Sequence, residues 1–187
     1  MTNLYFVRHS KIEYTHDDHS RQLSEEGKKS VPRVTKAFKD IQIDQIVSSP
    51  YIRAVDTIKG IAETKSMNIR TYDDLRERKV SNVFIDDFQT YTKKQWHDFC
   101  FKLEGGESLK EVQKRGSSVI DEIVKKNQGQ NIVVGTHGTF LAVILKHYDD
   151  RIDFEFWRNL KMPDIYKATF DIINDKCEMV SLENIKL

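Results

Sequence analysis

The chain has 187 residues, of which 39% are hydrophobic and 32% are charged, and this composition is typical of a globular protein rather than a disordered one. Its length suits one domain with a substantial core, so a single domain over residues 1–187 is expected. The 30 basic and 29 acidic residues leave no charge excess that favours nucleic-acid or membrane partners. Any anion-binding site must therefore be local.

Neither a membrane span nor a signal peptide is expected from the sequence. No apolar stretch approaches the roughly 20 residues that a span requires, and Met1-Thr2-Asn3 lacks a basic start. Cys100 and Cys177 lack CxxC spacing, so neither a disulfide framework nor a cysteine-based zinc site is expected. These features predict a cytoplasmic protein with reduced thiols.

Strands and helices alternate along the first third of the chain. A buried strand is predicted over residues 3–7, and an amphipathic helix follows from Ser24 to Phe38. A second strand is predicted over residues 41–47. Ser49 and Pro50 suit the N-cap and first turn of the next helix. The apolar face of that helix is expected to contain Ile52, Val55, Ile58 and Ala62.

The middle of the chain is less regular. A short strand is expected over residues 69–72, and residues 78–106 form a compact excursion, resembling a cap, with one aromatic-rich helix over residues 88–101. Ser108 and Glu111 form a capping-box pattern that predicts a helix to about residue 126.

The last third contains another strand, turn and helix. The predicted ranges are 132–134, 135–138 and 140–148. Residues 168–173 and 177–182 are two further expected strands joined around Asn174-Asp175, and whether they pair as a hairpin stays open at this point. The alternation predicts an α/β fold with three α/β/α layers and a mostly parallel central sheet.

This architecture gives the segment Arg8-His9 a functional meaning. Ligands of open α/β sheets bind outside the carboxyl ends of the strands, where Arg8-His9 and Thr136-His137-Gly138 both lie. Arg53 falls just inside a predicted helix N-terminus, where backbone N–H groups already favour an anion. Arginines, histidines and a helix end together indicate a phosphate site.

Five ordered motifs in the first 140 residues resemble those of the histidine phosphatase superfamily, also called the phosphoglycerate mutase-like family. The motifs are VRHS, SSPYIRAVDT, LRER, GGESLKEVQKR and VVGTHGT. The usual family signature is RHG, whereas this chain has Arg8-His9-Ser10. Serine reduces the backbone freedom beside the phosphate and adds a hydroxyl.

The resemblance implies a catalytic and phosphate-binding set. His9 would attack phosphorus and become phosphohistidine, while Arg8, Arg53 and His137 would bind the phosphoryl oxygens. The transferred group needs an in-line nucleophile and preorganised positive charge, which fits these residue types. Ser10 is expected to supply a further phosphate hydrogen bond. No metal ion or other cofactor is implied.

Glu77 in the LRER motif is the expected general acid, because similar family members place a glutamate after this leucine. Asp73, Asp74 and Glu13 are rival acids. Glu107 is either an acidic residue in the first turn of a helix or a residue that orients a catalytic group.

The function most favoured is a metal-independent phosphatase acting on a small-molecule phosphomonoester. The compact excursion favours a phosphatase by analogy with the family. A phosphoglycerate mutase-type phosphotransferase and a noncatalytic phospho-ligand-binding module stay open as alternatives.

Two further groups of residues have competing interpretations. Aromatic residues of the excursion are expected to form the core face of its helix rather than a substrate pocket: Phe84, Phe88, Tyr91, Trp96 and Phe99. The THDDHS segment contains metal-ligand types: His16, Asp17, Asp18 and His19. Because polar loops commonly have this composition, the segment is expected to border the active-site mouth without a metal. Lys11 either attracts an anion or points into solvent.

Overall fold

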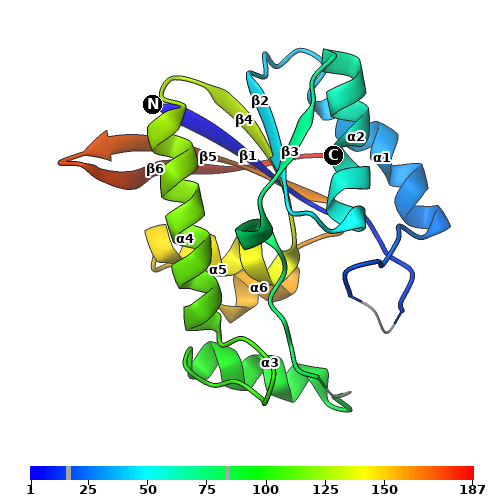
Figure 1. Ribbon diagram of the computed structural model, residues 1–187, viewed down its shortest axis with the longest axis vertical. Helices are drawn as coiled ribbons and strands as arrows, with labels where there is room; N and C mark the ends of the chain where they lie inside the picture. The colour runs from blue at the N-terminus through cyan, green and yellow to red at the C-terminus, as the bar shows by residue number, and fades with distance from the viewer. Residues whose placement is uncertain (16–17, 83–84) are drawn as a thin grey trace.

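The computed structural model describes residues 1–15, 18–82 and 85–187 of the chain. Its centre is a six-stranded sheet with the order β3-β2-β4-β1-β5-β6 (Figure 1). The strands are β1 (Thr2–Arg8), β2 (Gln45–Ser48), β3 (Ile69–Thr71), β4 (Asn131–Thr136), β5 (Asp164–Ile173) and β6 (Lys176–Ile185). β1 to β4 run parallel to one another, whereas β5 pairs antiparallel with both β1 and β6.

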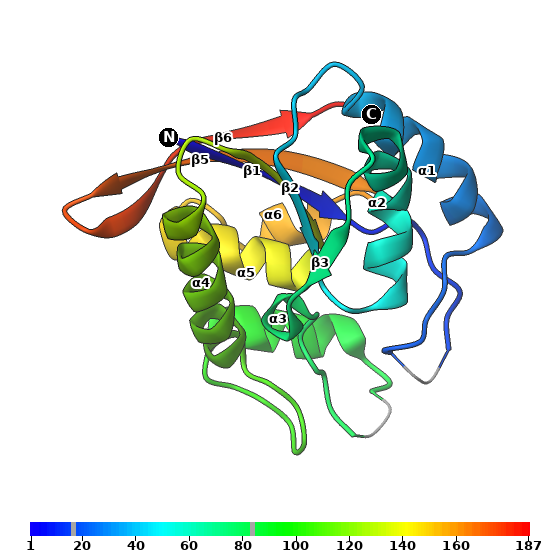
Figure 2. The same cartoon turned by 45° about the horizontal axis from the view of Figure 1, so that its top comes forward.

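Helices cover both faces of the sheet (Figure 2). They are α1 (Glu25–Ala37), α2 (Ile52–Lys65), α3 (Phe88–His97), α4 (Leu109–Lys126), α5 (Gly138–Tyr148) and α6 (Phe154–Asn159), with a 3-10 turn η1 (Asp73–Leu75). α1 and α2 pack on one face, and α4 and α5 pack on the other. α3 lies away from the sheet, beside the start of α4 (Figure 1).

The buried strand β1 shows how the sequence builds these layers. Leu4 and Phe6 contact the core on the α4/α5 side, while Tyr5 and Val7 contact the core on the α1/α2 side. Side chains alternate between the two faces of a strand, so a strand covered on both faces needs a continuous apolar run. Full burial of each large apolar side chain contributes about 1.5–3 kcal/mol.

The residues that predict helix starts and a turn in the sequence make the expected local contacts in the structure. Ser24 caps α1 by accepting a hydrogen bond from the Gly27 N–H at 3.1 Å. Ser108 and Glu111 form the predicted capping box of α4. Asn174 and Asp175 have φ of 50° and 64° in the turn between β5 and β6, as a tight hairpin requires. The fold prediction of a mostly parallel α/β/α sheet is confirmed.

The start of α2 differs from the prediction. The N-cap is Tyr51, and Ile52 is 37% exposed rather than part of the apolar face. The Ser49 hydroxyl accepts the Tyr51 N–H at 3.2 Å and lies 2.7 Å from His137 Nε2. Ser49 therefore belongs to a connection between β2 and β4 and does not cap the helix.

Other element boundaries shift because of tertiary contacts. β2 begins at Gln45 and not at residue 41. The backbone meets β4 only at residue 44, whose N–H donates to the carbonyl of Asn131. The helix predicted over 88–101 ends at His97, and Phe101 closes a turn onto Asp98. α6 was not predicted. In the described part of the chain, no helix combines the length and the apolar character needed to cross a membrane.

Candidate active site

The carboxyl edge of the sheet brings two histidines together. Arg8 ends β1 opposite Thr136 of β4, so the residues that follow, His9 and His137, leave the sheet side by side. Their ring centroids are 5.3 Å apart, and the residues are 5% and 0% exposed. The parallel register of β1 and β4 thus places two imidazoles in one buried crevice.

Arg53 reaches this crevice from the first turn of α2. It is 2% exposed, and its guanidinium lies over the Tyr51 ring at 4.8 Å. Its Nη1 donates to the backbone carbonyl of Asp18, and its Nη2 lies 3.2 Å from Asp18 Oδ1. The helix N-terminus adds backbone N–H groups and a favourable dipole for an anion.

The hydrogen bond of His9 fixes which ring nitrogen can react. Nδ1 lies 2.8 Å from the carbonyl oxygen of Ser10. A carbonyl only accepts, so Nδ1 carries the proton and Nε2 keeps a lone pair. Burial, followed by the charge of Arg53, lowers the pKa of His9 to about 3. His9 is therefore a neutral imidazole that can act as a nucleophile through Nε2.

His137 is held in a complementary state. Burial, followed by the charge of Arg53, lowers its pKa well below the ordinary value, so the ring is neutral. Ser49 Oγ accepts the Tyr51 N–H and has its own proton to donate to Nε2. This network assigns the ring proton of His137 to Nδ1.

Three side chains of the site each have a buried nitrogen without a hydrogen-bond partner within the described residues: Arg8 Nε, Arg53 Nε and His137 Nδ1. Buried polar groups of a folded protein are nearly always paired, so each needs an explanation. All three are donors in the assigned states. One anion held among them would satisfy them together, and the arrangement is suited to phosphoryl oxygens.

Arg8 is held in place by backbone groups that follow α6. Its Nη1 donates to the carbonyls of Leu160 and Lys161 at 2.6 and 3.1 Å. A Cβ on Gly138 would lie 2.9 Å from the guanidinium, so only glycine leaves room for it at the start of α5. Burial lowers the pKa of Arg8, and the carboxylates of Glu77 and Asp164 oppose that shift.

Glu77 is the carboxylate that the structure brings to the crevice. Its Oε1 accepts the backbone N–H groups of Arg78 at 2.8 Å and Phe140 at 2.9 Å, and its Oε2 accepts that of Thr139 at 3.0 Å. The carboxylate thus sits at the N-terminus of α5, just after His137. Each carboxylate oxygen has two lone pairs, so Oε2 keeps a second acceptor position for a proton.

The rival acids lie elsewhere. Asp73 and Asp74 pair with Arg76, and their side chains are 79% and 56% exposed. Glu13 is exposed in the loop before α1 and bonds through its backbone N–H to Gln22. Within the described part of the chain, Glu77 is the one of the four candidate acids that hydrogen-bonds the start of α5.

Ser10 and Lys11 bond to protein groups around α1. The Ser10 hydroxyl lies 2.8 Å from Ser30 Oγ, and its N–H donates to Thr57 Oγ1 at 2.9 Å. Lys11 Nζ lies 2.6 Å from Glu26 Oε1. The residue that replaces the family glycine therefore joins β1 to α1 and α2 through its polar groups.

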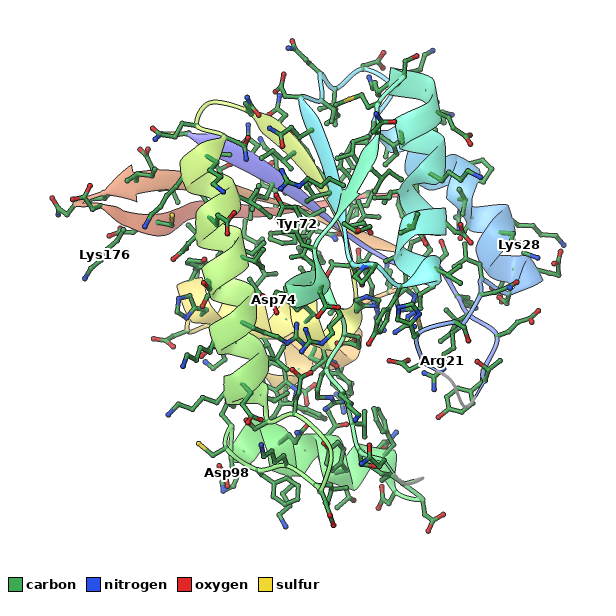
Figure 3. The ribbon with its side chains drawn as sticks, in the orientation of Figure 1. Arg21, Lys28, Tyr72, Asp74, Asp98 and Lys176 are labelled. Atoms are coloured by element: carbon green, nitrogen blue, oxygen red, sulfur yellow. The ribbon has the colours of Figure 1, made fainter. Side chains whose placement is uncertain are left out.

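The other candidate groups are placed as follows. Asp18 Oδ1 binds Arg21 at 2.7 Å as well as Arg53, and His19 packs against Tyr51 at 5.0 Å. His16 and Asp17 lie outside the described residues. Over the described ranges, no group of three histidine, cysteine, aspartate or glutamate side chains is arranged to hold a metal ion. Figure 3 shows Arg21 in the loop below α1.

The aromatic residues of the excursion anchor α3. Tyr91 is buried, Trp96 packs edge-on against Phe99, and Phe88 is 44% exposed. Phe84 lies outside the described residues. Arg78 is buried under Phe88 and Tyr91 and bonds to Gln95, so it ties α3 to the loop that carries Glu77.

Sequence reasoning missed two residues of the site. The sequence predicts Ser49 as a helix cap, and it places Asp18 in a loop at the mouth of the site without indicating a contact with Arg53. The position of Ser49 at the carboxyl end of a strand was a usable signal, because such ends face the ligand. No local pattern links Asp18 to Arg53, which is 35 residues away.

Comparisons with known proteins agree with this fold. Residues 4–185 match the family model of the histidine phosphatase superfamily (branch 1). Phosphoserine phosphatase 1 of Hydrogenobacter thermophilus is 28% identical over 155 residues, covering 73% of this chain and 71% of that protein.

Two solved structures have the same fold. A mycobacterial glucosyl-3-phosphoglycerate phosphatase has a TM-score of 0.79 at 19% identity, with 95% of this chain and 96% of that one covered. A mutant phosphoserine phosphatase from Entamoeba histolytica, in complex with phosphoserine, has a TM-score of 0.77 at 19% identity, with 97% and 96% covered. At this level of identity, the likeness shows a shared architecture.

Proposed function

The chain belongs to the histidine phosphatase superfamily, and on this premise we propose that it hydrolyses a small phosphomonoester through a phosphohistidine on His9. The observation that carries the proposal is the set of unpaired buried donors in the site, together with a neutral His9 whose Nε2 keeps its lone pair. These are the two things that phosphoryl transfer to a protein nitrogen requires: a nucleophile and preorganised positive charge.

In the first step, His9 Nε2 attacks phosphorus, and the N–P bond forms as the ester P–O bond breaks. Arg8, Arg53 and His137 donate to the phosphoryl oxygens, where negative charge is held throughout. Glu77 enters this step protonated and gives that proton to the leaving oxygen, which departs as an alcohol. The covalent intermediate is an N-phosphorylated His9.

In the second step, water attacks phosphorus and the N–P bond breaks. Glu77, which lost its proton in the first step, takes one from the attacking water. Inorganic phosphate leaves, and His9 returns to the neutral state that burial favours, with its proton on Nδ1 facing the Ser10 carbonyl. No metal ion takes part in either step, and one carboxylate serves as acid and then as base.

The substrate class that we propose is a small phosphorylated metabolite. A relative at 28% identity is named phosphoserine phosphatase, and a structural neighbour is named glucosyl-3-phosphoglycerate phosphatase. Phosphoserine and phosphoglycerate esters are therefore the first substrates to test.

The experiment measures phosphate release from p-nitrophenyl phosphate with EDTA present and traps the acid-labile phosphoenzyme after a rapid quench. His9→Ala is expected to abolish both signals, and His97→Ala, which changes an exposed histidine on α3, to preserve both. Turnover that persists in His9→Ala would contradict the mechanism. Saturable phosphate binding without turnover across a substrate panel would indicate a binding module instead.

A second assay separates hydrolase from mutase. The enzyme is incubated with 3-phosphoglycerate and a bisphosphate primer, and the products are resolved. Accumulation of free phosphate is expected if water is the acceptor. Accumulation of an isomerised phosphoglycerate would replace the proposed activity by phosphotransfer to a second hydroxyl.

A further inference from the structure

We propose that Arg115, with its charge balanced by Glu107, is a positioning residue that sets the place of Glu77. The inference rests on the proposed function, because it concerns the group that is expected to move the proton. Neither residue is in hydrogen-bond contact with Arg8, His9, Arg53 or His137 in the described chain.

Arg115 binds the loop that delivers Glu77. Its Nη1 donates to the carbonyls of Asp74 at 2.7 Å and Arg76 at 3.0 Å, and its Nη2 donates to the carbonyl of Glu77 itself at 3.3 Å. Figure 3 shows Asp74 beside α4, the helix from which Arg115 extends. One rigid guanidinium thus fixes three backbone positions that lead to the carboxylate, which a lysine ammonium cannot do in the same geometry.

Glu107 holds the same loop from its other side. Its carboxylate accepts Arg115 Nε at 2.8 Å and Nη2 at 3.0 Å, Arg76 Nη2 at 3.2 Å and the Lys79 N–H at 3.0 Å. Burial raises the pKa of Glu107, but the bonds from Arg115 and Lys79 outweigh it, and the net direction is downward. Glu107 is therefore a carboxylate that pairs with Arg115 and closes the loop on both sides of Glu77.

Arg115 also touches the second element that holds Glu77. Its guanidinium lies 5.7 Å from the centroid of the Phe140 ring, and the Phe140 N–H donates to Glu77 Oε1. The loop and the start of α5 are thus both in contact with one side chain. A misplacement of about 1 Å can cost about 100-fold in rate, so this contact matters for proton transfer.

The charge of Arg115 also acts on His137, and the experiment must separate this effect from the positioning of Glu77. It helps to lower the pKa of His137, although burial and Arg53 contribute more. Arg115→Lys keeps this charge and loses the fork that binds three carbonyls. Glu107→Gln keeps the shape of Glu107 and removes its charge. Both variants are informative, and Arg151→Lys, at an exposed ion pair with Asp149, is the matched control.

The experiment compares kcat/KM for phenyl phosphate and p-nitrophenyl phosphate, two substrates of similar shape. Phenolate leaves poorly without a proton, whereas p-nitrophenolate leaves readily, so a fault in the acid penalises phenyl phosphate more. General acid catalysis supplies about 10²–10⁴-fold in rate. We therefore expect Arg115→Lys and Glu107→Gln to lower kcat/KM for phenyl phosphate by about 10–100-fold. The decrease in kcat/KM for p-nitrophenyl phosphate is expected to be several-fold smaller than that. Arg151→Lys should leave the ratio unchanged.

Glu77→Gln separates the two proposals. A shifted ratio in Glu77→Gln with none in Arg115→Lys or Glu107→Gln overturns the positioning role and leaves the proposed function standing. An unshifted ratio in Glu77→Gln contradicts the assignment of Glu77 itself. In the double variant Glu77→Gln with Arg115→Lys, no further shift is expected, and an additive shift overturns the inference.

A structural loss is recognised independently. Inhibition by inorganic phosphate reports the anion site, so each positioning variant is expected to keep its inhibition constant within about two-fold while the substrate ratio changes. Loss of phosphate inhibition together with equal losses on both substrates means general disruption and overturns a specific positioning role. Should Arg115→Lys fail to fold, Glu107→Gln gives the same decision.

Discussion

The hydrogen bonds of Arg53 determine which of its nitrogens can bind a phosphate. It is buried, and both of its terminal nitrogens face Asp18, while Nε has no partner in the described chain. The edge formed by Nε and Nη2 is the bidentate face that suits a phosphate. Asp18 Oδ1 occupies the Nη2 half of that face, so the carboxylate and an incoming phosphate compete for the same donor.

Asp18→Asn is expected to tighten phosphate binding. The variant removes the competing charge but keeps the backbone carbonyl that holds Arg53 Nη1. Because the Asp18 side chain is 37% exposed, its ion pair is screened, and the gain is expected to be about 0.2–1 kcal/mol, or about 1.5–5-fold in the inhibition constant of inorganic phosphate. Glu13→Gln removes a charge from the same loop without touching Arg53 and is the control. Weaker inhibition in Asp18→Asn would show that the carboxylate holds Arg53 in position instead.

Between elements, α4 and α5 lie close enough to couple the loop of Glu77 to the start of α5. Gly116 follows Arg115 on α4, and a Cβ built on it would lie 2.3 Å from Ile144 Cδ1 and 2.8 Å from Phe140 Cε2. The missing side chain therefore lets α4 approach the face of α5 that carries Phe140. This close approach is what allows Arg115 to reach over the Phe140 ring.

Gly116→Ala tests that packing. Alanine favours a helix by about 1 kcal/mol, whereas overpacking a closed core costs about 1–3 kcal/mol, so the second effect is expected to win. We expect a net loss of up to about 2 kcal/mol in the free energy of unfolding, measured by urea denaturation. Ser118→Ala, at an exposed position of the same helix, should change stability by less than about 0.5 kcal/mol. A stabilised Gly116→Ala protein would mean that the two helices separate without cost.

At the scale of the whole molecule, folding buries His9 and His137 in their neutral form, which makes stability depend on pH. Burial is the main cause of the lowered pKa of both His9 and His137. The unfolded chain takes up protons on these residues near pH 6.5, whereas the folded chain does not until about pH 3 for His9. Between these values the unfolded state binds more protons, so stability rises with pH and falls on acidification.

The free energy of unfolding, measured in phosphate-free buffer, should therefore fall from pH 7 to pH 5. For His9 the loss by pH 5 is about 2 kcal/mol, from the gap between pH 5 and its unfolded pKa of about 6.5. His9→Asn is expected to remove about that much of the decline, and His97→Asn, at an exposed site, is the control. An identical decline in the wild type and His9→Asn would show that His9 is not held neutral.

The fold was largely predictable because its signals are local. Continuous apolar runs indicated β1 and β4, and the Ser108–Glu111 capping box indicated the start of α4. Boundaries set by contacts between distant segments were missed. β5 begins at Asp164, before its predicted start, because Asp164 pairs with Arg8 across the sheet. α6 is short, contains no fully buried residue and has no strong periodicity to reveal it.

The order of the strands and of the helices other than α6 was readable from the sequence, as was the position of Arg8, His9, Arg53 and His137 next to strand or helix ends. Such features depend on residue type and spacing, which a single sequence records. The tertiary structure alone decided which nitrogen of His9 keeps its lone pair, which carboxylate reaches α5, and which partners Arg53 and Arg115 bind. These outcomes depend on hydrogen bonds and burial among residues far apart in the chain, and only the packed sheet and helices bring those residues together.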